Sequence, residues 1–288
     1  MRKSRWRSGG RKGRRSMDEA IRKECMAYVG RQREATDSMA PETAAKQAHA
    51  LGVAAPEAEL PATWHWAYFN HGFPISNQGE DGHERLGLFL PPAPFHRRMW
   101  AAGDVTVHRP LRIGVPATRR STITDVAFKS GRTGDLCFVT VDHAIEQDGG
   151  LGVAERQTIV YRDCGLPEKA LRAPGDPVPD GYVVHPDMEL FFYSALTHNG
   201  HRIHWDRNFC REVEGYPGLI VHGPLMATKL CDAMAGTASV RRFAFRALAP
   251  VFDTTPIRLV HPAAGTGGEG RIERSDGVIS MQATLETA

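Results

Sequence analysis

The spacing of apolar residues near the start of the chain predicts two helices. Residues 17–34 place Ile21 and Cys25 on one face, which is the spacing of an amphipathic helix. A second helix is expected to begin at Pro41, because proline is favoured in the first helical turn, and to end at Gly52. Both helices precede the first strand-like segment.

Two groups of strand-like segments follow, and a helix opens the second group. In the first group, strands are expected over residues 105–113, 118–128, 136–145 and 151–161. A long apolar segment, residues 223–235, predicts a helix, and further strands are expected over residues 241–248, 256–260, 270–274 and 278–285. The segment V-H-R-P-L-R-I-G-V-P from Val107 also resembles F-R-A-L-A-P-V-F-D from Phe245, which supports an internal duplication.

The boundary between these groups is marked by composition. Residues 164–182 contain four prolines and three glycines, which predicts a linker. The expected organisation is therefore a first domain over residues 17–163 and a second over residues 183–288. Residues 1–16 precede both and are expected to be a disordered basic tail.

The charge of the chain is concentrated in that tail. The first fifteen residues hold eight Arg or Lys and no acid, so the formal net charge of +3 becomes −5 when they are removed. The remaining chain is mildly acidic and shows no general basic surface, which disfavours a nucleic-acid partner.

The remaining composition is that of an ordinary globular protein. Hydrophobic residues make up 41% of the 288 residues and charged residues 24%. The apolar runs are too short to span a bilayer, so no membrane partner is expected. The five cysteines form no C-x-x-C pair, which favours a reduced, cytoplasmic protein.

The segment H-N-G-H-R-I-H-W-D, residues 198–206, places three histidines three residues apart. Imidazoles are common zinc ligands, so His198, His201 and His204 raise the alternative of a metal site. The run lacks the cysteine or carboxylate spacing of the helical zinc motifs. We therefore expect no metal.

Longer motifs around this segment resemble a known family. Y-S-A-L-T-H-N-G-H-R-I-H-W-D from Tyr193 and E-G-Y-P-G-L-I-V-H-G-P-L-M-A from Glu214 resemble the MaoC-type R-specific enoyl-thioester hydratases. Their signature is roughly G-D-x-N-P-L-H, followed about twenty residues later by P-I-V-H-G-M. The resemblance covers the chain from about residue 60 to its end.

The first half narrows this resemblance. L-P-A-T-W-H-W-A-Y-F, L-F-L-P-P-A-P-F-H-R-R-M-W-A-A-G and V-A-E-R-Q-T-I-V-Y-R are similar to segments of the mesaconyl-C4-CoA (3-methylfumaryl-CoA) hydratases, relatives of mitochondrial 3-hydroxyacyl-thioester dehydratases. The resemblance implies an α+β double hotdog, with two antiparallel sheets each wrapped around a central helix. It also implies a CoA thioester substrate and no cofactor.

The motif match assigns three catalytic candidates. The motif's histidine corresponds to His204, which is expected to be the general base, since a histidine titrates near neutral pH. The motif's aspartate corresponds to Asn199, whose amide does not titrate but can orient a water molecule. Gly223 lies where the central helix begins, so its N–H is expected to hold the negative charge that develops on the thioester oxygen.

Three further residues are substrate-binding candidates. Arg98, in the R-M-W segment, is expected to bind the free carboxylate of a mesaconyl group. Arg202 is expected to bind a phosphate or carboxylate, and His222 precedes the helix start. A solvated charge pair at Arg97 and Arg98, and a structural histidine at His222, are the alternatives.

The expected function is a hydratase of an enoyl-CoA, converting mesaconyl-C4-CoA to citramalyl-CoA. A fatty-acid-type 3-hydroxyacyl-thioester dehydratase is the alternative within the fold. A non-catalytic hotdog that binds acyl-CoA or RNA is the alternative from another class. The first half offers only His71 in its equivalent region, so it is expected to be non-catalytic. An acyl-CoA is the expected partner, and a homodimer stays open.

Overall fold

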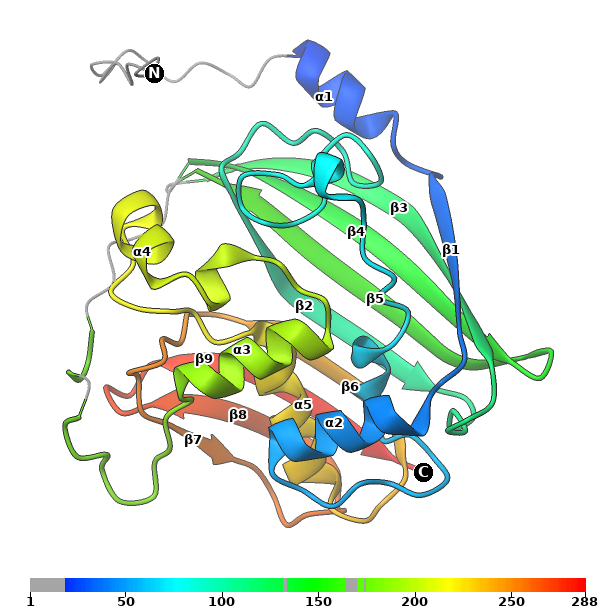
Figure 1. Ribbon diagram of the computed structural model, residues 1–288, viewed down its shortest axis with the longest axis vertical. Coiled ribbons are helices and arrows are strands. Elements are labelled where there is room, and N and C mark those ends of the chain that lie inside the picture. The colour runs from blue at the N-terminus through cyan, green and yellow to red at the C-terminus, as the bar shows by residue number, and fades with distance from the viewer. Residues whose placement is uncertain (1–18, 132–133, 164–169, 174) are drawn as a thin grey trace.

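One antiparallel sheet contains all nine strands of the residues that the structure describes. The structure is a computed structural model and describes residues 19–131, 134–163, 170–173 and 175–288. The strand order is β1-β3-β4-β5-β2-β6-β9-β8-β7 (Figure 1). The strands are β1 (Gln32–Asp37), β2 (Arg97–Val107), β3 (Ala117–Gly131), β4 (Gly134–Gln147), β5 (Gly150–Arg162), β6 (Val240–Ala247), β7 (Ile257–Val260), β8 (Gly268–Arg274) and β9 (Ile279–Thr287).

The two halves of the chain meet at the pair β2–β6. Ala102–Thr106 pairs with Arg242–Arg246 in antiparallel register. Because this pairing satisfies the backbone groups at both inner edges, the halves form one continuous sheet, where two separate sheets were expected. The α+β class is confirmed.

The second half is wrapped around helix α5 (Gly223–Ala235), as the apolar pattern predicts. The helix buries Leu225, Leu230 and Met234 in a core shared with Phe243 and Ile272 of the sheet. Strand β8 approaches the helix so closely that a Cβ at residue 270 would lie 2.5 Å from Met234 Sδ, so a larger residue there would force the Met234 side chain to move.

The first half has no such helix within its described residues, which corrects the expectation of a central helix in each half. Its sheet is covered by residues 60–96, which include the short 3₁₀ helices η1 (Trp64–Ala67) and η2 (Ile75–Asn77), and by α1 (Glu19–Met26). Residues 60–96 contain five prolines and four glycines. Proline removes a backbone donor and glycine favours extended or left-handed turns, so this segment cannot continue as a helix.

The start of the chain also departs from its prediction. The expected helix over residues 17–34 ends at Met26, and residues 32–37 form β1, which pairs with β3. Gly30 separates them with φ of +86°, a left-handed conformation that ends a helix. The second predicted helix is confirmed as α2 (Pro41–Leu51), with Gly52 as its left-handed cap.

Two further elements were wrongly placed or missed. The first long strand covers Arg97–Val107 instead of residues 105–113, because Pro110 cannot donate to a sheet. Helix α3 (Asp187–Leu196) was not predicted. The remaining predicted strands are confirmed within a few residues of their expected ends.

Some predictions fall outside the described residues. The basic tail, residues 1–16, is among them, as are residues 164–169 and 174 of the predicted linker. Within the described ranges, no helix combines the length and apolar character that a membrane span requires.

Candidate active site

The histidine-rich segment begins where α3 ends. Asn199 N–H donates to the carbonyl of Ser194 at 2.8 Å, which turns the chain back after the helix, and residues 202–204 form the short helix η3 (Arg202–His204). His201 and His204 are both 7% exposed, whereas His198 is exposed and packs its ring near Phe73 of the first half. The three histidines therefore do not converge on one point.

His204 is held as a neutral base. Its Nδ1 lies 2.7 Å from the carbonyl oxygen of Ile220. Since a carbonyl only accepts, the proton is on Nδ1 and Nε2 keeps its lone pair. Burial lowers the pKa of His204 to about 4, although the hydrogen bond to Ile220 opposes the shift. Near neutral pH this imidazole is uncharged and able to accept a proton.

His222 packs against one face of the His204 ring. The two imidazoles are stacked with centroids 3.7 Å apart and planes 19° apart. His222 is fully buried, and its Nε2 lies 2.8 Å from Ser194 Oγ. Its Nδ1 is buried without a partner among the described residues. Burial lowers the pKa of His222 well below its usual range, and His204 lowers it further.

The amide of Asn199 has a fixed orientation. Its Oδ1 accepts the backbone N–H of His201 at 3.0 Å. Because a backbone N–H can only donate, Oδ1 must face His201, and the NH₂ group is the end that points elsewhere. Within the described residues, no acceptor is recorded for this NH₂ group.

Gly223 is the first residue of α5, and His222 is its cap. A Cβ at residue 223 would lie 3.7 Å from the Trp100 carbonyl, an ordinary contact, and Gly223 is not among the residues with positive φ. Neither packing nor backbone conformation within the described residues therefore demands a glycine. A ligand oxygen that approaches the helix N-terminus does benefit from its small size.

The first half supplies a second polar group beside these residues. Asp81 and His83 lie in a loop that docks against the histidine segment, where a Cβ at residue 82 would be only 1.9 Å from the carbonyl oxygen of Gly200. Arg202 N–H donates to the Asp81 carbonyl at 2.8 Å. The sequence prediction missed Asp81 and His83, although the D-G-H triplet in a glycine-rich loop was visible.

Arg98 binds this loop. Its Nε lies 2.9 Å from Asp81 Oδ2 and donates to His83 Nδ1 at 3.1 Å. The His83 ring lies 4.3 Å from that of His201, and burial lowers the pKa of His201 well below its usual range, followed by the effects of His204 and Arg98. Arg98 thus contacts the loop that packs against His201, and it already has the carboxylate of Asp81 beside it. Its predicted role in binding a substrate carboxylate stays a prediction.

Within the described ranges, Asp81, His83 and His201 also lie close enough together to hold a metal ion. The Arg98 guanidinium already occupies Asp81 Oδ2 and His83 Nδ1. A metal would have to displace an internal cation from two of its three ligands, so these residues suit a metal poorly.

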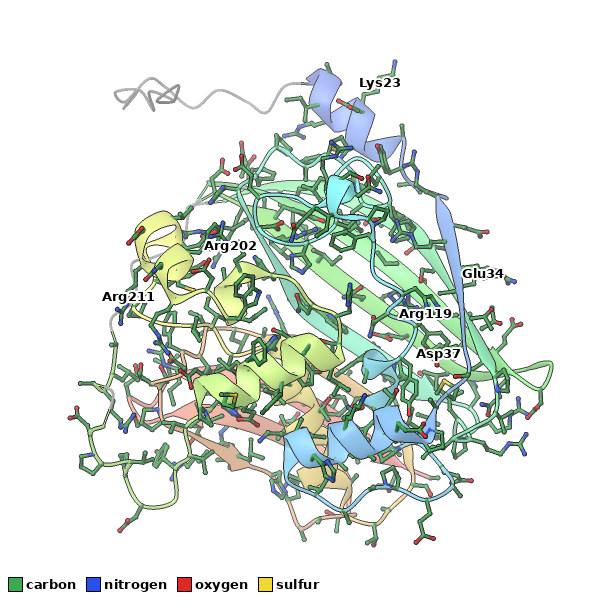
Figure 2. All side chains as sticks on the ribbon, viewed as in Figure 1. Lys23, Glu34, Asp37, Arg119, Arg202 and Arg211 are labelled. Carbon is green, nitrogen blue, oxygen red and sulfur yellow. The ribbon has the colours of Figure 1, made fainter. Side chains whose placement is uncertain are left out.

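Arg202 lies close to α4 (Arg207–Phe209) (Figure 2). Its guanidinium donates twice to Asp206 Oδ2, at 3.0 and 2.6 Å, and stacks on the Phe209 ring at 4.2 Å. Asp206 in turn caps α4 by accepting the backbone N–H of Phe209. Much of the charge of Arg202 is therefore directed at this carboxylate.

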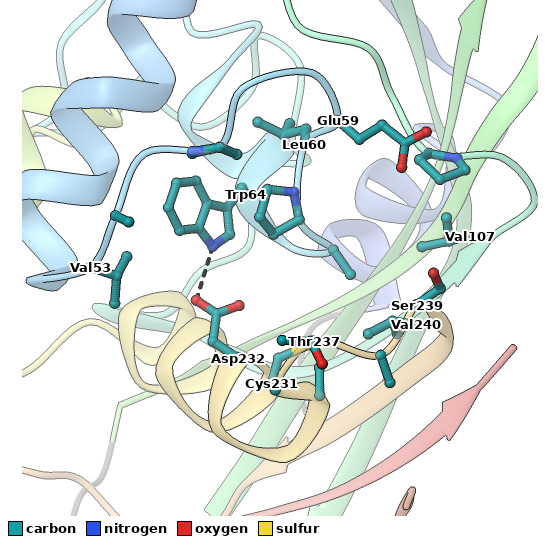
Figure 3. Close-up of a pocket in the computed structure, with 18 residues that line it drawn as sticks. Val53, Glu59, Leu60, Trp64, Val107, Cys231, Asp232, Thr237, Ser239 and Val240 are labelled. Atoms are coloured by element: carbon teal, nitrogen blue, oxygen red, sulfur yellow. Dashed lines mark hydrogen bonds between the residues drawn. The ribbon is translucent and has the colours of Figure 1, made fainter. Parts of the chain in front are cut away.

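A cavity of about 430 Å³ lies at the other end of α5, between that helix and the segment before η1 (Figure 3). Trp64 Nε1 donates to Asp232 Oδ2 there at 3.0 Å. Burial raises the pKa of Asp232 to about 7, with the Trp64 hydrogen bond opposing the shift. Cys231 and Asp232, which line this cavity, follow Gly223 by eight and nine residues on α5. This spacing is about 12 to 14 Å along the helix axis, so the cavity is not the site of the histidines.

Comparisons with known proteins identify the family of this chain. Residues 63–253 match the family model of hydroxyacyl-thioester dehydratase type 2. The chain is 41% identical over 273 residues to the mesaconyl-C(4)-CoA hydratase of Chloroflexus aurantiacus, covering 91% of this chain and 97% of that protein. It is 28% identical to the mitochondrial hydroxyacyl-thioester dehydratase type 2 of Schizosaccharomyces pombe, covering 69% of this chain and 77% of that protein.

Solved structures show the same fold. HtdX of Mycobacterium tuberculosis superposes with a TM-score of 0.66 at 15% identity, covering 90% of this chain and all of that one. A MaoC-like dehydratase from Phytophthora capsici superposes with a TM-score of 0.61 at 12% identity, covering 92% of this chain and 97% of that one. The superpositions confirm the double-hotdog fold, here with one continuous sheet and, among the described residues, a central helix in the second half alone. The MaoC-type resemblance is also confirmed, and the chain belongs to the hydroxyacyl-thioester dehydratase type 2 family.

Proposed function

We propose that this protein adds water to the double bond of an enoyl-CoA, with mesaconyl-C4-CoA as substrate and citramalyl-CoA as product. The observation that carries the proposal is the pairing of a base with a helix start. His204 keeps Nε2 unprotonated because Nδ1 is bound to Ile220, and it stacks on the residue directly before Gly223. The 41% identity to a mesaconyl-C(4)-CoA hydratase supports this choice of substrate.

The reaction follows from these two groups. His204 Nε2 takes a proton from water while the water oxygen bonds to the β-carbon. The electron pair of the double bond moves toward the thioester, and the Gly223 N–H stabilises the negative charge on the thioester oxygen. The imidazolium then returns its proton to the α-carbon, so His204 ends neutral. Dehydration is the same path in reverse.

Three other residues have supporting roles in this proposal. We assign Arg98 to the free carboxylate of the mesaconyl group, since its guanidinium has more donors than Asp81 and His83 use. Arg202 is assigned to the CoA phosphates because it is partly exposed two residues before the base. His222 is fully buried, so its proposed role is to hold the His204 ring instead of contacting substrate.

The proposed chemistry is divided between the halves. His204, Asn199 and Gly223 all come from the domain expected over residues 183–288, while residues 17–163 contribute Arg98 and its loop to the wall of the site. We therefore assign the reaction to the second half and the shaping of the acyl groove to the first. The linker expected over residues 164–182 stays a prediction, and so does the suggestion of a homodimer.

A fatty-acid-type 3-hydroxyacyl-thioester dehydratase is the second candidate, because the relative in Schizosaccharomyces pombe carries that description. The two substrates differ where the acyl group ends, since a carboxylate needs a cation and a long alkyl chain needs an apolar tunnel. Arg98 and its polar neighbours favour the carboxylate.

A substrate panel tests the proposal. Purified protein is mixed with mesaconyl-C4-CoA, crotonyl-CoA or trans-2-decenoyl-CoA, and loss of the conjugated enoyl absorbance is followed. We expect the highest kcat/KM with mesaconyl-C4-CoA. A preference for decenoyl-CoA would select the second candidate, and no turnover of any enoyl-CoA would indicate a non-catalytic hotdog that binds its ligand.

A further inference from the structure

Residue 199 presents a donor where the family motif has a carboxylate. The backbone N–H of His201 holds Asn199 Oδ1 at 3.0 Å, so the NH₂ group is the part of this side chain left for a ligand. An aspartate would satisfy the same backbone N–H with one oxygen and present its second oxygen to the ligand. The exchange therefore replaces an acceptor with a negative charge by a neutral donor.

The structure of the proposed substrate explains why asparagine is favoured over aspartate at residue 199. In mesaconyl-C4-CoA the free carboxylate is bonded to the same carbon that receives the water. Any group that holds the water is consequently a neighbour of that carboxylate. An aspartate at residue 199, which is half-buried, would place two carboxylates side by side, where like charges repel.

The Asp81 carboxylate lies within 4.8 Å of a ring nitrogen of His201, but it is paired with Arg98, whose Nε lies 2.9 Å from Asp81 Oδ2. Among the described residues, no hydrogen bond or ion pair joins His204 or His222 to a carboxylate. His201, His204 and His222 contact one another through their rings. When His204 accepts a proton during the reaction, its charge forms in a buried place without a protein carboxylate that is free to offset it.

We propose that Asn199 selects enoyl-CoA substrates with a free carboxylate on the β-carbon, and that this substrate carboxylate takes the part of the motif's aspartate beside the His204 imidazolium. The Asn199 NH₂ donates to a carboxylate oxygen of the substrate. The inference rests on the proposed hydratase function and specifies its substrate class. No atom is transferred to or from the carboxylate, because it acts only through its charge and its hydrogen bond.

A matched pair of substrates tests this directly. 3-Methylcrotonyl-CoA differs from mesaconyl-C4-CoA by a methyl group in place of the carboxylate. The wild type and Asn199→Asp are compared on both, with kcat and KM measured separately. We expect the wild type to favour mesaconyl-C4-CoA in kcat as well as KM, since the carboxylate stabilises a charge formed during turnover.

The variant should reverse this preference. Asn199→Asp is expected to lower kcat/KM for mesaconyl-C4-CoA by about 10²-fold through like-charge repulsion and to raise it for 3-methylcrotonyl-CoA. Asn199→Ala is the control, because it removes the donor without adding charge and should not raise turnover of 3-methylcrotonyl-CoA. Aspartate keeps an acceptor for the His201 N–H, and circular dichroism checks the fold.

The outcomes distinguish failure of the inference about Asn199 from failure of the proposed hydratase function. If the wild type hydrates both substrates equally well, or if Asn199→Asp lowers turnover of both by the same factor, the inference about Asn199 is wrong and the hydratase function stands. If the wild type hydrates no enoyl-CoA at all, the proposed function fails, and this inference fails with it.

Discussion

Two buried histidine clusters, one in each half, differ in how their nitrogens are satisfied. In the first half His65 Nε2 lies 2.8 Å from Glu155 Oε2, and Trp66 Nε1 donates to Glu155 Oε1 at 3.0 Å. In the second half the rings of His204 and His222 stack on each other, and no carboxylate contact of these two rings is recorded among the described residues.

The difference separates a buried ion pair, to which we assign a structural role, from the base that we propose for the reaction. Burial raises the pKa of Glu155, but the hydrogen bonds and charge of its neighbours, His65 first, outweigh burial and leave the pKa lowered. That carboxylate stays ionised, so the His65–Glu155 pair is strongly held. His204 instead has its pKa lowered to about 4 by burial, and its lone pair stays available. Buried groups without partners cost stability, which makes them candidates for function.

The largest effect is expected from the base. His204→Ala should lower kcat by about 10²- to 10⁴-fold, the usual contribution of a general base, with the fold retained. The measurement is turnover of mesaconyl-C4-CoA together with circular dichroism. His198→Ala is the matched control, since His198 belongs to the same sequence motif but is exposed. Near-normal turnover by His204→Ala would remove this residue from the mechanism.

Substitution in the His65–Glu155 pair of the first half should lower stability and leave activity nearly unchanged. His65→Ala leaves Glu155 buried without its histidine, and breaking a buried pair costs about 3 kcal/mol or more of unfolding free energy. Activity per folded molecule should change little. Urea unfolding and kcat are measured in parallel, with His71→Ala as the exposed control. A large loss of kcat without loss of stability would show that the first half takes part in the chemistry.

The pH profile sharpens the same contrast. With the pKa of His204 lowered to about 4, the neutral base is present throughout the range above that pH and is lost as pH falls through it. Hence kcat/KM should change less than about twofold between pH 7.5 and 5.5, whereas a histidine of ordinary pKa, about 6.5, would lose about tenfold. A midpoint near 6.5 would mean that burial does not control this group.

Sequence patterns predicted the second half better than the first, for a physical reason. Helix α5 has a regular apolar spacing, and it packs on strands that follow it closely in sequence. The periodicity of apolar residues was therefore sufficient to predict these elements. In the first half, residues 60–96 cover the sheet without regular structure, and β1 pairs with β3 across a large sequence separation. Such contacts depend on tertiary packing, which periodicity does not encode.

The residues of the candidate site likewise divide into those that the sequence predicted and those that it missed. The motif supplied His204, Asn199 and Gly223, which come from two short segments of the second half. Asp81 and His83 were missed because they reach the site only through the close approach of Gly82 to Gly200. The motif also could not show which end of the Asn199 amide faces a ligand, because that depends on the backbone N–H of His201.

The smallest effect is expected from metal removal. This experiment tests whether the histidine cluster of the second half acts without a metal ion. Asp81, His83 and His201 are spaced to hold a metal ion, but Arg98 donates to the first two. Dialysis against a strong chelator should therefore leave kcat and the melting temperature unchanged, and metal analysis should find well under one zinc per chain. Stoichiometric zinc that is lost together with activity would contradict this. It would mean that Arg98 gives way to a metal and that a metal-bound water, instead of His204 alone, carries the reaction.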